Sequence, residues 1–281
     1  MRWFRRLSGR GRPLVLEAQG SAVHIEGDAR PRRGNSNART AIIAHWAAYA
    51  RVDRSASELT RAVLGNGYDV VFVSAAHGSQ PLEWADGRPQ GITVLRRPNV
   101  GYDFGSWATA LEYYPDIAES ADVLMLNDSL VGPFEPIDHL LDQFHRSAAD
   151  VWALTDTTQF RHHLQSYGLG FKYQRLLEAP LARFWRNIRA EESREGVIWR
   201  NEIGLSRLLD QERFVAEAAI PFWRVVAEGQ NPTILGWRRL LDIGFPFVKR
   251  QLIREPQVAP DGLQVRAEIR RRFGADVDEW L

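Results

Sequence analysis

Two short segments place oxygen-rich side chains where an open parallel sheet binds its ligands. The first is Asn127-Asp128-Ser129, which directly follows the apolar run 124–126. A carboxylate beside neutral oxygens is a donor set that Mg²⁺ or Mn²⁺ accepts, usually together with substrate phosphates. The alternative is a plain turn, because Asn, Asp and Ser are common turn residues and Gly132-Pro133 follows. We therefore take Asp128 as a candidate metal ligand.

The second segment is N-V-G-Y-D-F-G at residues 99–105, ahead of a predicted helix. Gly101 and Gly105 permit tight turns or close approach of a ligand, and the first amide groups of the helix are free to meet an anion. Asp103 would repel a phosphate placed against it, so it suits hydrogen bonds from ribose or sugar hydroxyls. The alternative is that Asp103 only caps the helix.

Three later segments also carry polar groups. Residues 162–167 (H-H-L-Q-S-Y) gather hydrogen-bonding side chains, and since adjacent histidines point in different directions we expect one substrate contact rather than a chelating pair. Lys249 and Arg250 can neutralise a leaving diphosphate or pair with surface acids. Glu202 is either a favourable acid in the first turn of a helix or a general base.

Alternating strand and helix patterns must position these segments. Apolar and β-branched runs predict strands at 41–44, 69–74, 92–95, 123–126 and 151–154, with helices from Ser55 or Ser57 to 64 and over 104–114. Beyond Lys172 the pattern predicts helices at 172–189, 201–211, 233–243 and 262–273. This alternation indicates an α/β fold: a Rossmann-type, mostly parallel sheet with helices on both faces and a helical C-terminal portion.

The predicted domain organisation is a leader and one domain. Residues 1–39 are rich in Arg, Gly, Ser and Asn, which is typical of a loosely ordered segment, with at most one strand near residues 14–16. Its arginines can contact anionic lipid head groups at a membrane surface, although we expect a solvated tail. Residues 40–281 are predicted to form a single domain.

Composition excludes several classes of protein. The 36 Lys and Arg residues balance 35 Asp and Glu residues to a net charge of +1, so a nucleic-acid partner is not expected. The absence of cysteine excludes disulfides, thiolate zinc sites and cysteine nucleophiles. No apolar run reaches the roughly 20 residues that span a bilayer, and the basic start lacks the apolar part of a secretory signal. We therefore expect a soluble, cytoplasmic protein.

Seven segments, in order from Ala41 to Pro256, resemble the rhamnan synthesis F family. Each is modestly specific alone, and their common order makes a chance match an insufficient explanation. The segments are I-I-A-H-W at 42–46, N-V-G-Y-D-F-G-S-W at 99–107, L-M-L-N-D-S-L-V-G-P-F at 124–134, D-V-W-A-L-T at 150–155, H-L-Q-S-Y at 163–167, N-E-I-G-L-S at 201–206 and P-F-V-K-R-Q-L-I-R at 246–254.

The resemblance implies a GT-A-like fold and transfer of L-rhamnose, typically from dTDP-L-rhamnose, to a cell-surface polysaccharide or its lipid-linked precursor, with inversion. By this analogy residues 127–129 stand where GT-A enzymes bind Mg²⁺ or Mn²⁺, but with one carboxylate instead of the usual pair. Residues implied to bind the donor or to face the sugar or acceptor are Asn99, Gly101, Tyr102, Asp103, Asn127, Asp128, Ser129, His163, Gln165, Ser166, Lys249 and Arg250.

Sugar transfer sets two chemical requirements. The departing nucleoside diphosphate develops negative charge, which a metal at Asp128, Lys249 with Arg250, or both can stabilise. The incoming hydroxyl needs a proton acceptor, for which Glu202 is the first candidate and His163 the second. The alternatives are a non-catalytic carbohydrate-binding or assembly protein on the same fold, and an unrelated nucleotide-dependent α/β enzyme. Against the latter, the chain has neither a G-x-x-x-x-G-K-[ST] loop nor a G-x-G-x-x-G after its first predicted strand.

Overall fold

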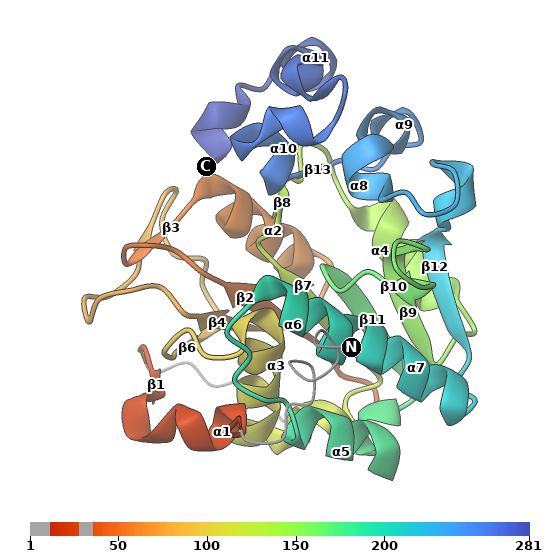
Figure 1. Cartoon of the computed structure of the whole chain (residues 1–281). Coiled ribbons are helices and arrows are strands. Elements are labelled where there is room, and N and C mark those ends of the chain that lie inside the picture. The colour runs from red at the N-terminus through yellow and green to blue at the C-terminus, as the bar shows by residue number, and fades with distance from the viewer. Residues whose placement is uncertain (1–11, 28–35) are drawn as a thin grey trace.

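The computed structural model describes residues 12–27 and 36–281, and within them one nine-stranded sheet organises the molecule (Figure 1). Its strands are β1 (His24–Ile25), β2 (Arg39–His45), β4 (Asp69–Ser74), β6 (Thr93–Arg96), β7 (Asp122–Asn127), β9 (Val151–Thr157), β10 (His163–Leu164), β11 (Gly168–Lys172) and β12 (Ala216–Ile220). Their order is β1-β6-β4-β2-β7-β11-β9-β10, with β12 paired to β9.

The sheet is mostly parallel, as the sequence predicts. Strands β6, β4, β2 and β7 are successive parallel neighbours. Strand β11 runs antiparallel to both β7 and β9, so β9 again points along β7, and β12 is parallel to β9. Only β1, β11 and β10 run the other way among the described strands. The carboxyl ends of β2, β7 and β9 therefore share one edge of the sheet.

Helices cover both faces of the sheet because the central strands are buried on both sides. In β7, Leu124 and Leu126 face one apolar core, which also contains residues of α2 (Arg54–Gly65) and α4 (Asp138–Arg146). Val123 and Met125 face the other core, against α3 (Tyr102–Tyr113), α5 (Ala179–Arg186) and α7 (Ile203–Gln211). Figure 1 shows α3, α5 and α7 together on the viewer's side of the sheet.

Helix α3 is fixed tightly against the strands. Its N-cap is Gly101, whose φ of +76° suits glycine, and a Cβ there would lie 2.5 Å from the Val15 side chain. The buried Trp107 donates a hydrogen bond of 3.1 Å from Nε1 to the Leu126 carbonyl. The helix thus starts two residues earlier than predicted, and Asp103 lies in its first turn instead of capping it.

The C-terminal portion has a small apolar core of its own beside the sheet. Strand β13 (Val248–Lys249) pairs antiparallel with β8 (Leu130–Val131), and Figure 1 shows the blue C-terminal helices gathered around this pair and α2. A further two-stranded pair joins β3 (Arg51–Val52) to β5 (Glu83–Trp84). The remaining helices are α6 (Arg194–Val197), α8 (Pro232–Leu235), α9 (Trp237–Asp242), α10 (Arg250–Arg254) and α11 (Val265–Phe273).

Several expectations need correction. Residues 12–27 are not a loose leader: α1 (Val15–Ala18) inserts the fully buried Val15 into the core, and β1 extends the sheet. Residues 1–11 and 28–35, on which the predicted membrane contact mainly depends, lie outside the described residues. The predicted helix 172–189 is reduced to α5, and 233–243 divides into α8 and α9 at Gly236.

Two smaller differences concern caps and strands. Asp53, rather than Ser55 or Ser57, caps α2 by accepting a hydrogen bond from the Ala56 amide. Strands β11 and β12 fall in segments that the sequence analysis left unassigned or helical. Within the described ranges, no helix has both the length and the apolar character needed to cross a membrane.

Candidate active site

A cavity of about 730 Å³ opens at the edge of the sheet where β2, β7 and β9 end. The first turn of α3, the loop after β7, the segment around β10 and the start of α10 all contribute to its wall. All but two of the predicted site residues line it: Tyr102, Asp103, Asn127, Asp128, Ser129, His163, Gln165, Ser166, Glu202, Lys249 and Arg250. The two segments with which the sequence analysis begins therefore meet in one cleft.

The two exceptions have structural positions. Asn99 is exposed and is not among the lining residues. Gly101 is buried, and its Cα faces Val15 and the Arg189 carbonyl, where there is no room for a side chain. Gly105 likewise permits close packing, because a Cβ there would lie 2.2 Å from the Val100 carbonyl. These glycines shape the loop that presents Asp103.

Hydrogen bonds made by its own side chains fix the loop after β7. Asn127 Oδ1 accepts hydrogen bonds from the amide and the hydroxyl of Ser129, at 3.1 and 2.6 Å. Asn127 Nδ2 donates to Asp103 Oδ2 at 2.7 Å, and Asp128 Oδ2 accepts from the Trp46 amide at 2.9 Å. Asn127 therefore links the loop to α3, while Asp128 links it to the end of β2.

Asp103 and Asp128 form an acidic pair in the cleft. Burial, together with the negative charge of Asp128, raises the pKa of Asp103 to about 7. The pair supplies a second carboxylate that the Asn127–Ser129 segment lacks by itself. This second carboxylate, Asp103, belongs to α3 and lies 24 residues before Asn127 in the chain. Its position beside Asp128 could be found only from the fold.

The donor chemistry of this pair fits Mg²⁺ or Mn²⁺. Carboxylates are the hard oxygen ligands that these ions prefer, and a cation would offset the repulsion between the two carboxylates, which adds to the effect of burial on the Asp103 pKa. In the described part of the chain no three or more His, Cys, Asp or Glu side chains are grouped to hold a metal. Asp103 and Asp128 would thus need further ligands from a substrate or from water, as is usual for Mg²⁺.

Two cationic side chains from the C-terminal portion, Lys249 and Arg250, contact this loop from its other side. Lys249 Nζ donates to Ser129 Oγ at 3.2 Å and lies 4.9 Å from the centre of the Tyr167 ring. Burial lowers the pKa of Lys249 to about 8. Pairing of β13 with β8 sets this position, because it places Lys249 directly opposite Leu130.

Arg250, the next residue, has most of its donors engaged. Its Nε donates to the Asp128 carbonyl at 2.9 Å, and one terminal nitrogen lies 2.8 Å from Asp53 Oδ2. The side chain is only 11% exposed, so the pair with Asp53 is not a surface ion pair. Its second terminal nitrogen, Nη2, is buried without a hydrogen-bond partner in the described structure.

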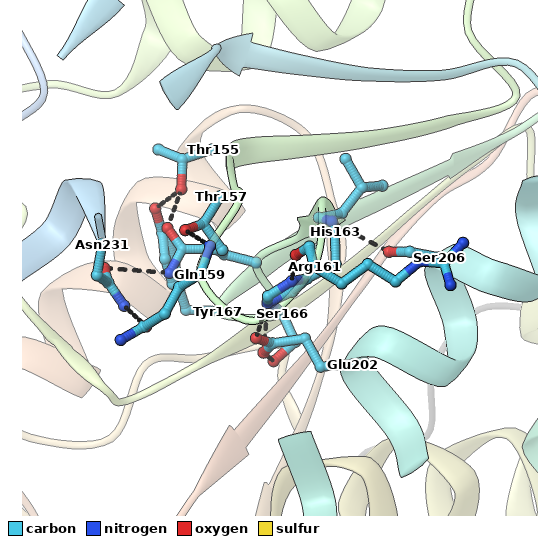
Figure 2. A network of polar contacts seen from close by, with 12 residues as sticks. Thr155, Thr157, Gln159, Arg161, His163, Ser166, Tyr167, Glu202, Ser206 and Asn231 are labelled. Carbon is cyan, nitrogen blue, oxygen red and sulfur yellow. Dashed lines mark hydrogen bonds and ion pairs between the residues drawn. The ribbon is translucent and has the colours of Figure 1, made fainter. Parts of the chain in front are cut away.

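The buried His163 and the largely buried Glu202 form a dyad in the cleft. His163 lies in β10, which β7, β11 and β9 separate from β2 in the sheet, and Figure 2 shows the network around the dyad. His163 Nε2 lies 3.0 Å from Glu202 Oε1. Glu202 Oε2 accepts from the amide of Ser166 at 3.1 Å and, at short range, from its hydroxyl. Burial raises the pKa of Glu202, but these hydrogen bonds and the charge of His163 outweigh it and leave the pKa below its usual value.

The local backbone presents Glu202 to the cleft. Residues Ile198–Glu202 form a π-helical turn between α6 and α7, a feature frequent at functional sites.

Gln165, two residues beyond His163, accepts a hydrogen bond from Thr155 at 2.7 Å and donates to Asn231 at 3.3 Å. The chain just after β10 is therefore fixed to β9 and to the residue that caps α8.

Sequence reasoning missed several lining residues. Trp46 directly follows β2, so the rule that locates ligand sites at the carboxyl ends of strands could have found it. No comparable pattern marks the others, which reach the cleft only through the fold. These include Tyr49, Arg51, Asp53, Phe160, Arg194, Asn231 and Arg254.

The mostly parallel sheet, with helices on both faces and a charged cleft at its carboxyl edge, is that of an α/β protein of the Rossmann type. The chain belongs to the rhamnan synthesis protein F family, whose model matches residues 90–278. This confirms the family resemblance, and the matched region contains six of the seven segments, all but the one at 42–46.

Individual relatives are more distant. Two curated proteins called virulence protein VirA, from Vibrio anguillarum (strain ATCC 68554 / 775) and from Vibrio anguillarum, are each 27% identical over 193 residues, or 57% of this chain and 62% of theirs. The chain thus spans less than two thirds of their length. A crystal structure of a proposed nucleotide-diphospho-sugar transferase from Desulfovibrio desulfuricans G20 aligns with a TM-score of 0.35 at 12% identity, covering 64% of this chain and 79% of that one. A similarity this low carries no argument about function.

Proposed function

We propose that this protein is a glycosyltransferase that moves a sugar from a nucleotide-sugar donor to a saccharide acceptor in polysaccharide synthesis. The proposed donor is dTDP-L-rhamnose, because the family is named for rhamnan synthesis. The observation that carries the proposal is that one cleft holds both a cationic side, Lys249 with Arg250, and a buried carboxylate of lowered pKa, Glu202. These are the two groups that sugar transfer requires.

The cationic side suits the leaving diphosphate. Lys249 and Arg250 lie on the same short segment, and the buried Nη2 of Arg250 is a donor still without a partner in the described residues. A fixed cation facing the oxygen on which charge develops stabilises the transition state, because it needs no reorganisation during the reaction. A bound Mg²⁺ or Mn²⁺ at Asp128, with Asp103 as the second carboxylate, would add neutralising charge to the diphosphate.

The carboxylate side suits the acceptor. Glu202 has a lowered pKa and is therefore ionised at neutral pH, so it can take the proton of an attacking hydroxyl. His163 and Ser166 hold the carboxylate in one orientation through both of its oxygens. Attack by the hydroxyl on the face opposite the diphosphate would invert the anomeric centre in a single displacement.

Donor turnover tests the proposal. Purified protein mixed with dTDP-L-rhamnose and Mn²⁺ is expected to release dTDP slowly, and faster when a saccharide acceptor is added. Calorimetry should show binding of the donor, and dTDP-glucose in the same titration tests how far the cleft selects the sugar. Failure to bind any nucleotide sugar, with or without Mn²⁺, would contradict the proposal.

A second function, a non-catalytic carbohydrate-binding or assembly protein, is favoured by one observation. Both oxygens of Glu202 already accept hydrogen bonds from His163 and Ser166, which is also how a purely structural carboxylate is held. Such a protein would bind saccharide or nucleotide sugar without turnover. Single-turnover measurements at high protein concentration separate the two functions, because only the enzyme releases the nucleoside diphosphate.

A further inference from the structure

Phe160 combines exposure with an unusual backbone conformation at the rim of the cleft. Its side chain lines the cavity, and the residue is 61% exposed. Its φ of +68° lies in the left-handed region, which bulky side chains rarely adopt. Strain of this kind persists only where the surroundings enforce it, and it concentrates at binding and catalytic sites.

The loop around Phe160 is firmly held by its neighbours. The Gln159 amide donates to Thr157 Oγ1 at 3.1 Å, and Thr158 Oγ1 accepts from the Gly229 amide at 2.7 Å. On the other side of Phe160, His162 Nε2 lies 2.8 Å from Asp156 Oδ2. Polar contacts therefore anchor the chain both before and after Phe160.

Trp199 packs against the Phe160 ring. The two ring centroids are 5.6 Å apart with planes inclined by 45°, and Trp199 is itself 36% exposed. Trp199 lies in the π-helical turn three residues before Glu202, and Phe160 lies three residues before His163. The aromatic pair is thus attached to both segments that carry the dyad.

We propose that Phe160, supported by Trp199, is the acceptor subsite and stacks against the apolar face of a pyranose ring. The C–H bonds on that face carry slight positive charge, which matches the negative face of an aromatic ring. Neither ring carries a charge, whereas the groups that suit a diphosphate, Lys249 and Arg250, belong to another segment. A sugar stacked here would bring a hydroxyl toward Glu202. The inference rests on the proposed function, because it assigns a role within the same cleft.

Replacing Phe160 with glycine tests the subsite without disturbing the loop. Glycine adopts a positive φ freely, so Phe160→Gly should fold and melt at or above the temperature of the wild-type protein. The matched control is Trp223→Ala, because Trp223 is 68% exposed and is not among the residues described as lining the cleft. Both variants can be compared with the wild type in the same measurements.

The probes are the methyl glycosides of α-L-rhamnose, β-D-glucose and N-acetyl-β-D-glucosamine at millimolar concentration, detected by saturation-transfer NMR. We expect the wild type and Trp223→Ala to bind at least one of them, and Phe160→Gly to bind it about tenfold more weakly. Binding of dTDP-L-rhamnose by calorimetry should be the same in all three proteins. For transfer to the glycoside, Phe160→Gly should raise the acceptor KM and leave the donor KM unchanged.

Two outcomes would overturn the subsite: no glycoside binds the wild type, or Phe160→Gly binds as tightly as the wild type. The second outcome would leave the aromatic pair to another occupant, such as a protein partner. The proposed function fails separately. If the wild type binds a glycoside at Phe160 but neither binds nor hydrolyses any nucleotide sugar, the subsite stands and the transferase does not.

Discussion

His163 faces the Glu202 carboxylate with one ring nitrogen and a backbone carbonyl with the other. Nε2 lies 3.0 Å from Glu202 Oε1, and Nδ1 lies 2.7 Å from the Arg161 carbonyl oxygen. Both ring nitrogens are therefore engaged, one with a backbone carbonyl and one with a carboxylate. The two contacts fix the orientation of the imidazole ring, and with it the position of the Glu202 carboxylate.

Glu202→Gln tests the general base. The amide keeps the size of the side chain and can still accept hydrogen bonds from Ser166, but it cannot take a proton. We expect sugar transfer to fall by about 10² to 10⁴, with little change in donor affinity by calorimetry. Glu255→Gln is the control, since Glu255 also lines the cleft but is exposed. Equal turnover by Glu202→Gln and the wild type would exclude the base role.

Asp128 has two possible functions that different substitutions separate. Its carboxylate is the candidate metal ligand, and it also accepts the Trp46 amide at 2.9 Å. Asp128→Asn keeps an acceptor for that amide, whereas Asp128→Ala removes it. If Asp128 binds a metal, both variants should lose the stimulation of dTDP release by Mn²⁺. If it only positions the loop, Asp128→Asn should retain that stimulation and Asp128→Ala alone should be impaired.

The buried carboxyl of Asp103 predicts a pH-dependent stability. Its pKa is about 7 in the folded protein and 3.8 is its ordinary value, so the folded state binds the proton more tightly. Stability from this group is full below pH 4 and is lost as the pH rises toward 7. Asp103→Asn, which cannot ionise, should therefore be more stable than the wild type at pH 8, by an amount on the order of 2 kcal/mol.

Urea denaturation at pH 5 and pH 8 measures this effect. The difference in unfolding free energy between Asp103→Asn and the wild type should grow as the pH rises between these values. Asp116→Asn provides a control, since Asp116 is a partly exposed carboxylate in the turn after α3 and is not among the residues that line the cleft. A difference that does not change with pH would show that Asp103 ionises in the folded protein as it does in the unfolded chain.

The lowered pKa of Lys249 predicts that donor binding depends on pH. Its pKa is lowered to about 8, so the side chain loses its charge as the pH rises through that value. Donor affinity should fall between pH 7 and pH 9 in the wild type. Lys249→Arg, which stays charged, should not show this fall, and Lys249→Met should bind about tenfold more weakly at pH 7. Parallel pH profiles for the wild type and Lys249→Arg would contradict the assignment.

Alanine substitutions at two glycines are expected to change the stability of the protein in opposite directions. A Cβ at Gly170 in β11 would lie 2.4 Å from the ring of Phe144, which is fully buried. Gly170→Ala should cost about 1–3 kcal/mol by overpacking this core. Gly204 lies in α7, where a Cβ would have no neighbouring atom nearer than 4.0 Å, so Gly204→Ala should stabilise the protein by up to about 1 kcal/mol. Thermal denaturation of the two variants measures both shifts.

The strands that lead into the cleft could be predicted because they are buried on both faces. Strand β4 begins and ends where predicted, and β7 extends the predicted strand by one residue at each end. Such strands are continuous apolar runs, and polar residues at their ends stand out. Strand β11 could not be recognised, since Gly168 and Gly170 give its sequence a low strand propensity. The glycines are needed there because Leu154 and Phe144 pack directly beneath them.

The contacts between site residues could not be predicted, because they join distant parts of the chain. Glu202 meets His163 across 39 residues, and Lys249 meets Ser129 across 120. The second contact depends on β8 and β13, which have two residues each. Strands this short leave no recognisable periodicity. The sequence therefore indicates which residues have suitable chemistry, while the fold determines which of them act together.

The pairing of β8 with β13 also affects the order in which the cleft is completed during synthesis. The loop that carries Asp128 emerges from the ribosome some 120 residues ahead of Lys249, its cationic counterpart. A nascent chain that has not yet reached residue 248 holds the acidic half of the cleft without Lys249 and Arg250. We therefore expect donor binding to arise only after residues 248–250 have been synthesised and β13 has paired with β8.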